Sequence, residues 1–306
     1  MLLVTGGTGY LGSALLDLLV RRGYEVRAAV RDADRARRRL PGEVALVEAD
    51  VGDVEGLTRA ARGCTGVLHL AGSVGESAAE TWRLNVEGTR AVLAAATAVG
   101  AERFVYTSSS AAVIDADGLV AERPVGPPAL TDPYSTSKAA AERLVLDAAA
   151  NGLPAVVVNP VGIYGPSPRG PLSYNSLLLA AARGEVTAVI DAEIGWVLAE
   201  DAAAGHVLAL EHGEPGRRYV LCGEVASFGR VLHEFATRVG GQRVATLPPG
   251  STLGPGASTF ARRSEVYGRF PPVHIDDAGA RALGFRPCGV TEGIARTAAW
   301  TGPVQA

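Results

Sequence analysis

Lysine is almost absent from this chain. The 306 residues include 29 basic residues, and Lys138 is the only lysine among them. Arginine stays protonated and presents a wide planar fork, whereas the compact ammonium of lysine changes its pKa readily when it is buried or crowded. A single lysine, four residues after Tyr134, indicates a position that arginine cannot fill. Chance is the simpler alternative, so the rest of the chain has to decide between the two.

Cysteine, net charge and long apolar runs are scarce as well. The three cysteines, Cys64, Cys222 and Cys288, show no disulfide or metal-ligand spacing, so we expect a reducing compartment and no metal site. A net charge of −3 gives no reason to expect nucleic acid or an anionic membrane as a partner. The sequence shows no signal-peptide pattern and no apolar run long enough to span a bilayer. These absences predict a soluble cytoplasmic protein, and the 47% apolar share predicts a globular one.

A glycine-rich turn follows the first apolar run, residues 2–5. An amphipathic helix that ends at Gly23 and a second strand over 25–30 come next. Glycines let the backbone turn tightly and approach a pyrophosphate, which then lies at the positive end of the helix. This order of elements predicts a dinucleotide site. Its candidate residues are Gly6, Thr8, Gly9, Tyr10, Leu11 and Gly12.

The end of the second strand favours NADP over NAD. In sites for NAD, an acidic side chain near this point binds the ribose 2′-hydroxyl. Here the strand ends at Val30, which cannot make that bond, and Arg31 follows, whose guanidinium can pair with a 2′-phosphate. Arg35 or Arg38 can add to the same site. The alternative is that Arg31 is a solvent-facing strand end.

Strands and helices continue to alternate after this unit. Such alternation predicts an α/β fold with a doubly wound parallel sheet (Rossmann), in which ligands bind at the carboxyl ends of the strands. The further strands are predicted at 44–48, 67–70, 104–107, 155–159 and 218–222, and the helices between them at 53–62, 78–99 and 133–150.

The second half of the chain divides less clearly. We expect a dinucleotide-binding domain over residues 1–165, completed by about 186–240. Residues 166–185 and 241–306 are expected to form a small, discontinuous substrate-binding lobe. Within it, the proline- and glycine-rich stretch 248–256 and the run 261–272 are predicted to be loops.

Tyr134 and Lys138 lie on one face of the helix that Asp132 is expected to cap. A neighbouring ammonium lowers the pKa of a phenol, which brings it closer to what acid–base catalysis at neutral pH needs. Ser110, at the end of the fifth strand, can hydrogen-bond the same substrate oxygen. A nicotinamide would exchange hydride while Tyr134 exchanges the proton. Asn85, within a helix, is either a structural pin or part of a proton path.

Together these motifs resemble the extended short-chain dehydrogenases/reductases, the NAD-dependent epimerase/dehydratase family. The resemblance rests on residues 5–12, Asp50-Val51, Leu70-Ala71-Gly72, Asn85, Ser110, Tyr134-x-x-x-Lys138 and residues 159–166. Residues 24–32 are similar to the dihydroflavonol-reductase-like branch, whose members use NADPH on ketones and aldehydes. The resemblance implies Ser110, Tyr134 and Lys138 as a catalytic triad, with Lys138 also holding the nicotinamide ribose, and a homodimer built on two long helices. Further expected cofactor contacts are Asp50, Val51, Leu70, Ala71, Gly72, Pro160 and Ile163.

The substrate is less defined than the reaction. Ser73, Ala111, Tyr164 and Trp196 are expected to wall the pocket, and their small and apolar character favours an apolar or aromatic carbonyl compound over a diphosphate-linked sugar. Arg169 is the one obvious candidate for binding a diphosphate. A nucleotide-sugar epimerase with the same triad stays open as an alternative, and a non-catalytic NADP-binding sensor is a lesser one. A dehydratase would need acidic residues after the fifth strand, where the chain has Ser110-Ala111-Ala112.

Overall fold

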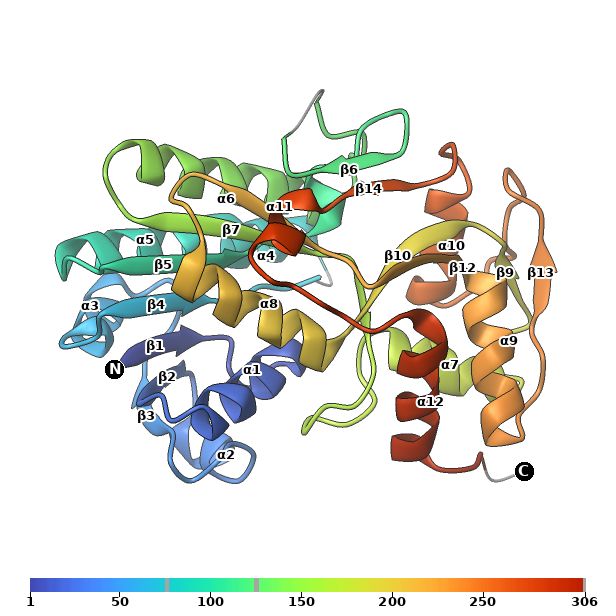
Figure 1. The fold of residues 1–306 in the computed structure, drawn as a ribbon, viewed down its shortest axis with the longest axis horizontal. Helices are drawn as coiled ribbons and strands as arrows, with labels where there is room; N and C mark the ends of the chain where they lie inside the picture. Colours follow the sequence, from blue (N-terminus) through green and yellow to red (C-terminus); the bar gives the residue numbers. More distant parts are fainter. Residues whose placement is uncertain (75–76, 124–126, 305–306) are drawn as a thin grey trace.

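A central parallel sheet carries the first two thirds of the molecule. The computed structural model describes residues 1–74, 77–123 and 127–304 (Figure 1). Seven strands pair in the order β11-β7-β5-β4-β1-β2-β3, and every pair is parallel. The predicted doubly wound α/β class is therefore confirmed. The strands are β1 (Leu2–Thr5), β2 (Val26–Val30), β3 (Ala45–Glu48), β4 (Gly66–His69), β5 (Arg103–Thr107), β7 (Ala155–Pro160) and β11 (Arg218–Leu221).

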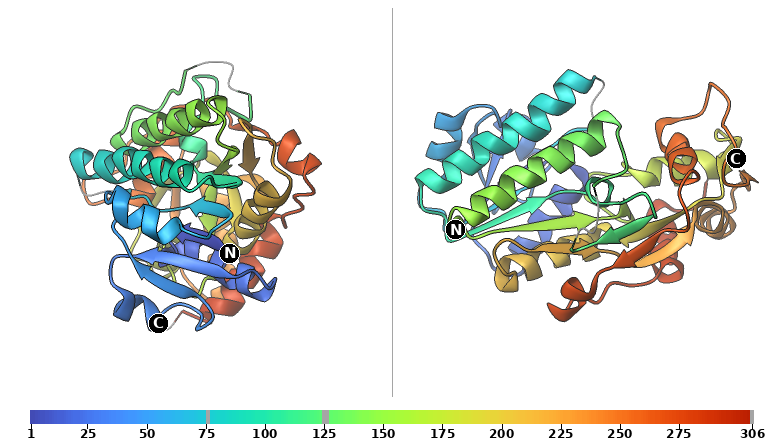
Figure 2. Two further views of the ribbon diagram at one scale, coloured as in Figure 1. Left: turned by 90° about the vertical axis from the view of Figure 1, so that its left-hand side faces the viewer. Right: turned by 90° about the horizontal axis from the view of Figure 1, so that it is seen from above.

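Helices cover both faces of this sheet (Figure 2). α1 (Tyr10–Arg21) and α8 (Ala199–His212) pack on one face, and α3 (Val54–Ala61), α5 (Gly88–Ala98) and α6 (Pro133–Ala150) pack on the other. The short α2 (Ala33–Arg37) follows β2. Successive strand residues point to opposite faces, so Val4 belongs to one apolar core and Leu3 to the other. β1, β4 and β7 are buried along their whole length, which explains why their sequences are almost continuously apolar, whereas the edge strand β3 is partly exposed.

The strand order reverses beside β1. β2 and β3 lie on one side of it and β4 and β5 on the other, so the connections leave β1 and β4 in opposite directions. Such a reversal opens a crevice at the carboxyl ends of the two strands. Thr5 and His69 are paired neighbours at these two ends, and the candidate site lies directly beyond them.

The long helix predicted over 78–99 contains a wider turn. α4 (Ala78–Trp82) continues into a π-helical turn (Arg83–Glu87) and then into α5. π-turns are rare and often mark functional positions. This one places the buried Asn85 at the turn, beside the residues that follow β4.

A second, smaller lobe follows β7 and has its own apolar core. In Figure 1 it lies at the side of the sheet where the strands end. Its strands and helices are β8 (Gly162–Tyr164), α7 (Tyr174–Ala182), β9 (Ala188–Ile190), β10 (Glu193–Leu198), β12 (Glu224–Ser227), α9 (Phe228–Val239), β13 (Ala245–Leu247), α10 (Thr259–Tyr267) and α12 (Val290–Thr301). A short pair, β6 (Leu119–Ala121) with β14 (His274–Asp276), the short helix α11 (Ala278–Ala282) and a 3-10 turn after β5 (Ser110–Ala112) complete the described elements.

Two details of the predicted domain plan differ from the structure. Of residues 186–240, α8 and β11 join the central sheet, whereas β9, β10, β12 and α9 belong to the lobe core. The run 261–272 was predicted to be a loop, and this was wrong, because α10 occupies 259–267. Ser258 caps that helix by accepting a hydrogen bond from the Ala261 amide. Within the described part of the chain, no helix combines the length and the apolar character needed to cross a membrane.

Candidate active site

Two adjoining cavities lie at the carboxyl edge of the central sheet. The larger, of about 680 Å³, follows the ends of β1, β2 and β4, and the smaller, of about 390 Å³, extends from there past β5 and β7 to the lobe. Cavities of this size are typical of small-molecule and cofactor sites. Both are lined by Gly6, Gly9, Leu70, Gly72 and Ser73, so together they form one groove.

The glycine-rich turn fits a dinucleotide pyrophosphate. Gly6 has a φ of 74°, and a Cβ on it would lie 2.4 Å from the Ala71 backbone nitrogen. A Cβ on Gly12 would lie 2.1 Å from the Gly6 carbonyl oxygen, so larger residues cannot pack here. α1 begins at Tyr10, and no side chain caps its first turn. Its first backbone N–H groups are therefore available to an anion.

Most of the predicted cofactor contacts line this groove. Asp50 is the exception, because its carboxylate accepts a hydrogen bond from the Gly52 amide at 2.9 Å and it does not form part of the cavity wall. In this structure Asp50 therefore caps the loop that follows β3. Thr8, Arg31, Val51 and Ala71 line the larger cavity, and Tyr10, Leu11, Gly12, Tyr134, Lys138, Pro160 and Ile163 line the smaller one.

Four arginines line the larger cavity: Arg31, Arg35, Arg39 and Arg169. None of them forms an ion pair with a described carboxylate. Asp32, which lines the same cavity, instead caps α2 by accepting from the Arg35 amide at 2.7 Å. Repulsion from Arg169 is the main cause of a lowered pKa at Arg39. Four cations facing one carboxylate, Asp32, give this end of the groove an excess of positive charge that attracts an anion.

Arg169 is the most constrained of these four side chains. Its Nε is buried and has no hydrogen-bond partner among the described residues. A buried N–H without a partner is unfavourable unless a ligand supplies an acceptor. The segment that carries it is fixed to α1, because the Ser167 hydroxyl donates to the Tyr10 carbonyl at 3.0 Å. The structure therefore places Arg169 at the cofactor end of the groove and not in the smaller cavity.

Lys138 is buried on α6, with 5% of its surface exposed. Its Nζ donates to the Thr107 carbonyl at 2.8 Å and to the Tyr106 hydroxyl at 3.4 Å. Burial lowers the pKa of Lys138 from 10.5 to about 8, and the carboxylate of Glu142 opposes this by favouring the charged form. The ammonium can therefore lose its proton near neutral pH, which an arginine cannot do.

The pKa of Tyr134 is shifted by other groups than the sequence predicted. Burial raises its pKa, whereas a hydrogen bond from Ser109 and the positive charge of Arg263 lower it, and Lys138 is not among the causes. The expectation that Lys138 lowers this pKa is therefore not met in this structure, because the lysine points to the end of β5. The neighbouring hydroxyl, Ser110, hydrogen-bonds Tyr267 instead. Ser109 and Ser110 both line the smaller cavity.

Asn85 acts as a structural pin. Its Oδ1 accepts from the Ser73 amide at 2.7 Å, and its Nδ2 donates to the Ser73 carbonyl at 2.9 Å and the Ser137 hydroxyl at 2.8 Å. All of these groups are engaged in holding the chain after β4 against α6. Of the two roles that the sequence left open, the contacts favour the pin.

The expected substrate pocket is partly wrong. Ser73 and Ala111 line the smaller cavity, but Tyr164 and Trp196 are each only 1% exposed and lie in the lobe core. The Trp196 ring packs edge-on against Tyr164 and Tyr174, and its Nε1 donates to the Ala226 carbonyl. Residues 193–198 form a strand buried on both faces, so its sequence does not show which side chains reach the cavity.

The lobe contributes Tyr174, Arg263 and Tyr267 to the cavity wall. The sequence did not single out the last two, which lie on α10, a segment predicted to be a loop. The Ser258 cap is the signal that would have found this helix. Within residues 1–74, 77–123 and 127–304, no group of three or more histidine, cysteine, aspartate or glutamate side chains is arranged to hold a metal ion.

Comparison with known proteins agrees with this geometry. The model of the NAD dependent epimerase/dehydratase family matches residues 2–222. A protein of Synechocystis sp. named "Putative dihydroflavonol 4-reductase" is 36% identical over 247 residues, which cover 78% of this chain and 72% of the relative. The UDP-glucose 4-epimerase of Streptomyces lividans is 30% identical over 314 residues, covering 93% of this chain and 91% of the relative.

A solved structure shares the whole fold. MoeE5, solved in complex with UDP-glucose and NAD, superposes with a TM-score of 0.79 over 98% of both chains and is 27% identical. The similarity therefore extends through the lobe as well as the central sheet. The relatives include a reductase and proteins that handle nucleotide sugars, so they fix the type of cofactor chemistry more tightly than the substrate.

Proposed function

Because the chain belongs to the NAD dependent epimerase/dehydratase family, and is thus an oxidoreductase or epimerase of the extended short-chain dehydrogenase/reductase type, we propose that it is an NADPH-dependent reductase of a ketone or aldehyde. The observation that carries this proposal is that the half-buried Tyr134 and the buried Lys138 line one small cavity next to an arginine-lined cofactor groove. A bound NADPH supplies the hydride. The chain itself has to bind the carbonyl, orient it and deliver the proton.

Tyr134 is proposed to donate its hydroxyl proton to the carbonyl oxygen. Ser109, which already hydrogen-bonds the phenol, is proposed to share that oxygen, and Ser110 remains the candidate expected from the resemblance. The ammonium of Lys138 is proposed to hold the nicotinamide ribose, because its Nζ lies beside Gly72 on the cavity wall. The apolar surroundings exclude water and strengthen these interactions.

The choice of NADP rests on the four unpaired arginines. A nucleotide with a 2′-phosphate brings two more negative charges to a cavity that has no free carboxylate on its described wall, apart from the capping Asp32. Guanidinium groups bind phosphate through paired hydrogen bonds. The proposed contacts are Arg31, Arg35 and Arg39, with Arg169 from the opposite wall.

A nucleotide-sugar epimerase is the second candidate. The identity to the UDP-glucose 4-epimerase and the UDP-glucose bound by MoeE5 favour it. A diphosphate needs cations near the substrate, and Arg169, the candidate that the sequence offered, lies in the cofactor groove instead. The smaller cavity of about 390 Å³ must also receive the nicotinamide, which leaves space for a compact substrate. These two points favour the reductase.

The protein is also proposed to be a homodimer. α5 and α6 lie side by side on one face of the sheet (Figure 2), and small residues such as Ala94 and Ala98 are exposed there. Pairing of these two helices with their copies would form a closed four-helix contact. Light scattering should give twice the mass of one chain, and a monomer at micromolar concentration would remove this part of the proposal.

One experiment tests the main proposal. Purified protein is assayed with NADPH and with NADH against a panel of aromatic and aliphatic carbonyl compounds, beside UDP-glucose and other nucleotide sugars. We expect NADPH oxidation with at least one carbonyl compound and a loss of about a hundredfold or more in Tyr134→Phe, because the proton donor is gone. Cofactor binding in this variant should be unchanged. Epimerisation of UDP-glucose without carbonyl reduction would instead support the second candidate.

A further inference from the structure

The smaller cavity has an unusual charge balance. No aspartate or glutamate lines its described wall, and the cations there are Lys138 and Arg263. Lys138 is already engaged by the Thr107 carbonyl and the Tyr106 hydroxyl. Arg263 is the positive charge that remains for a substrate, and it stands on the lobe side, opposite the end of the sheet.

Arg263 lies near Tyr134, and the hydrogen-bond donors of its guanidinium are not all used. Its Cζ lies 5.5 Å from the centroid of the Tyr134 ring, which is cation–π distance. The nearest carboxylate, Asp132, is 3.7 Å from its Nη2, which is too long for a hydrogen bond. No hydrogen bond from the guanidinium to a described residue is present. A guanidinium has five N–H donors, so Arg263 keeps donors for a ligand.

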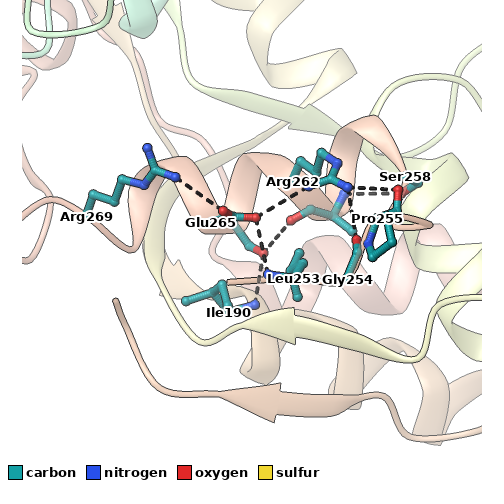
Figure 3. A network of polar contacts seen from close by, with 10 residues as sticks. Ile190, Leu253, Gly254, Pro255, Ser258, Arg262, Glu265 and Arg269 are labelled. Atoms are coloured by element: carbon teal, nitrogen blue, oxygen red, sulfur yellow. Dashed lines mark hydrogen bonds and ion pairs between the residues drawn. The ribbon is translucent and has the colours of Figure 1, made fainter. Parts of the chain in front are cut away.

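Other residues of α10 hold the helix in place through polar contacts with the preceding loop (Figure 3). Arg262 donates to the carbonyls of Gly254 and Pro255, both at 2.9 Å. Glu265 accepts from the Leu253 amide at 3.3 Å and pairs with Arg269. These contacts fasten the helix to the loop before it. They leave the neighbouring face, with Arg263 and Tyr267, directed to the cavity.

Helix α10 is anchored to the lobe core as well. The Ser264 hydroxyl accepts from the Ile190 amide at 2.9 Å, which joins the helix to β9. Arg263 is therefore presented by a rigid element, and only 17% of its side chain is exposed. A partly buried cation with free donors, held on a rigid helix, is suited to bind an anionic group of defined position.

We propose that Arg263 binds a carboxylate of the substrate, so that the reductase acts on carbonyl compounds that also carry an acidic group. The inference rests on the proposed function, because it takes the smaller cavity as the substrate site. The carbonyl oxygen would lie at the Tyr134 hydroxyl, and the carboxylate would lie beyond it, toward the lobe. A planar carboxylate can accept two parallel hydrogen bonds from the guanidinium. The apolar part of the substrate would contact Tyr174, Tyr267 and Ile163.

The test measures binding, which does not depend on turnover. Protein loaded with NADP⁺ is titrated calorimetrically with benzoylformate and with 3-acetylbenzoate, and with the methyl ester of each. We expect each acid to bind about tenfold or more tightly than its ester in the unmodified protein. Arg263→Gln should weaken the acids by about tenfold to a hundredfold and leave the esters unchanged. Arg263→Lys should restore part of the difference.

Two control variants separate this role from a structural one. Asp132→Ser removes the charge that faces Arg263 but keeps an N-cap for α6. If Arg263 only docks the lobe through Asp132, this variant should weaken the acids as Arg263→Gln does. If Arg263 binds the substrate, Asp132→Ser should bind the acids as tightly as the unmodified protein does, or more tightly. Arg269→Gln, on the exposed side of α10, should change nothing.

The outcomes distinguish the inference from the proposed function. Equal binding of acids and esters in the unmodified protein overturns the inference, even if the esters are reduced. Equal weakening of acid and ester in Arg263→Gln overturns it too. Binding of UDP-glucose that depends on Arg263, without binding of the acids, points to the epimerase. Selective acid binding without NADPH oxidation supports the carboxylate site and removes the reductase.

Discussion

Replacing Lys138 by methionine should stabilise the cofactor-free protein at pH 7 while it removes a residue of the proposed reaction. Burial lowers the pKa of this lysine from 10.5 to about 8, a difference of about 2.5. Each pKa unit corresponds to about 1.4 kcal/mol, so keeping the buried ammonium charged at pH 7 lowers the free energy of unfolding by about 3 kcal/mol. Methionine leaves the Thr107 carbonyl without its donor, which costs roughly 1 kcal/mol. The expected net gain is about 2 kcal/mol.

The sign of the pH dependence follows from the same values. The folded pKa lies below the unfolded one, so between pH 8 and 10.5 the unfolded chain binds more protons than the folded chain. Stability of the unmodified protein therefore rises with pH across this window. Of the roughly 3 kcal/mol that the buried ammonium costs in free energy of unfolding at pH 7, about 2 kcal/mol should be recovered by pH 9.5. The gain in stability of Lys138→Met over the unmodified protein should therefore nearly vanish at pH 9.5.

Urea unfolding of the cofactor-free protein at pH 7 and pH 9.5 measures both effects. Arg143→Met is the matched control, since Arg143 lies on the same helix and 78% of its side chain is exposed. It should show no comparable pH-dependent gain. A Lys138→Met variant that is destabilised equally at both pH values would refute the reasoning. It would mean that the contacts of the ammonium outweigh its desolvation.

Two further predictions concern the cofactor and the serines. Arg169→Gln should weaken NADPH binding about tenfold and NADH binding little, because one charge-assisted contact to the 2′-phosphate is lost. Arg37 is exposed on α2 and does not line the cavity, so the control Arg37→Gln should change the binding of neither cofactor. Fluorescence titration with NADPH and NADH measures both variants. Equal losses for the two cofactors would assign Arg169 to the pyrophosphate. Ser109→Ala should lower kcat and raise the apparent pKa of the Tyr134 step, since its hydrogen bond stabilises the phenolate, whereas Ser110→Ala should mainly raise KM. The reverse pattern in the pH–rate profiles would return the catalytic role to Ser110.

The dinucleotide half of the molecule is readable from sequence because its signals are local. The glycines of the first turn are required by contacts within a few residues or with the adjacent strand end, as Gly6 and Gly12 show. The apolar strands are short and bounded by turns, so their positions agree with the structure within a residue or two. The Asp132 cap and Pro133 likewise place the start of α6 correctly.

The lobe is less readable because its structure depends on distant contacts. α10 mixes apolar and polar residues, and Arg262, Ser264 and Glu265 bond it to the loop at 253–255 and to β9. Nothing in the local pattern reveals those partners. Trp196 shows a different limit: both faces of its strand are buried, so an aromatic residue expected in the pocket lies in the core instead.

The spacing of Tyr134 and Lys138 in the sequence did not predict where the lysine side chain ends. Four residues on a helix place two side chains on one face, but they do not fix where a long side chain ends. Lys138 extends to the end of β5, and the positive charge that acts on Tyr134 comes from Arg263, far away in the sequence. The place of Tyr134 and Lys138 in one cavity could therefore be predicted, whereas their electrostatic surroundings required the structure.

The choice between lysine and arginine at each position agrees with the surroundings of the side chain. At Lys138 a cation is buried with two oxygen acceptors, and its lowered pKa of about 8 allows it to lose a proton; arginine would bring five donors and a charge that it cannot lose. At the cofactor groove, Arg31, Arg39 and Arg169 face open space, where mutual repulsion is tolerable until an anion neutralises them. At the lobe, Arg263 needs a planar fork to orient a substrate. The one lysine in the chain thus stands where its chemistry differs from that of arginine, and chance is the weaker explanation of its position.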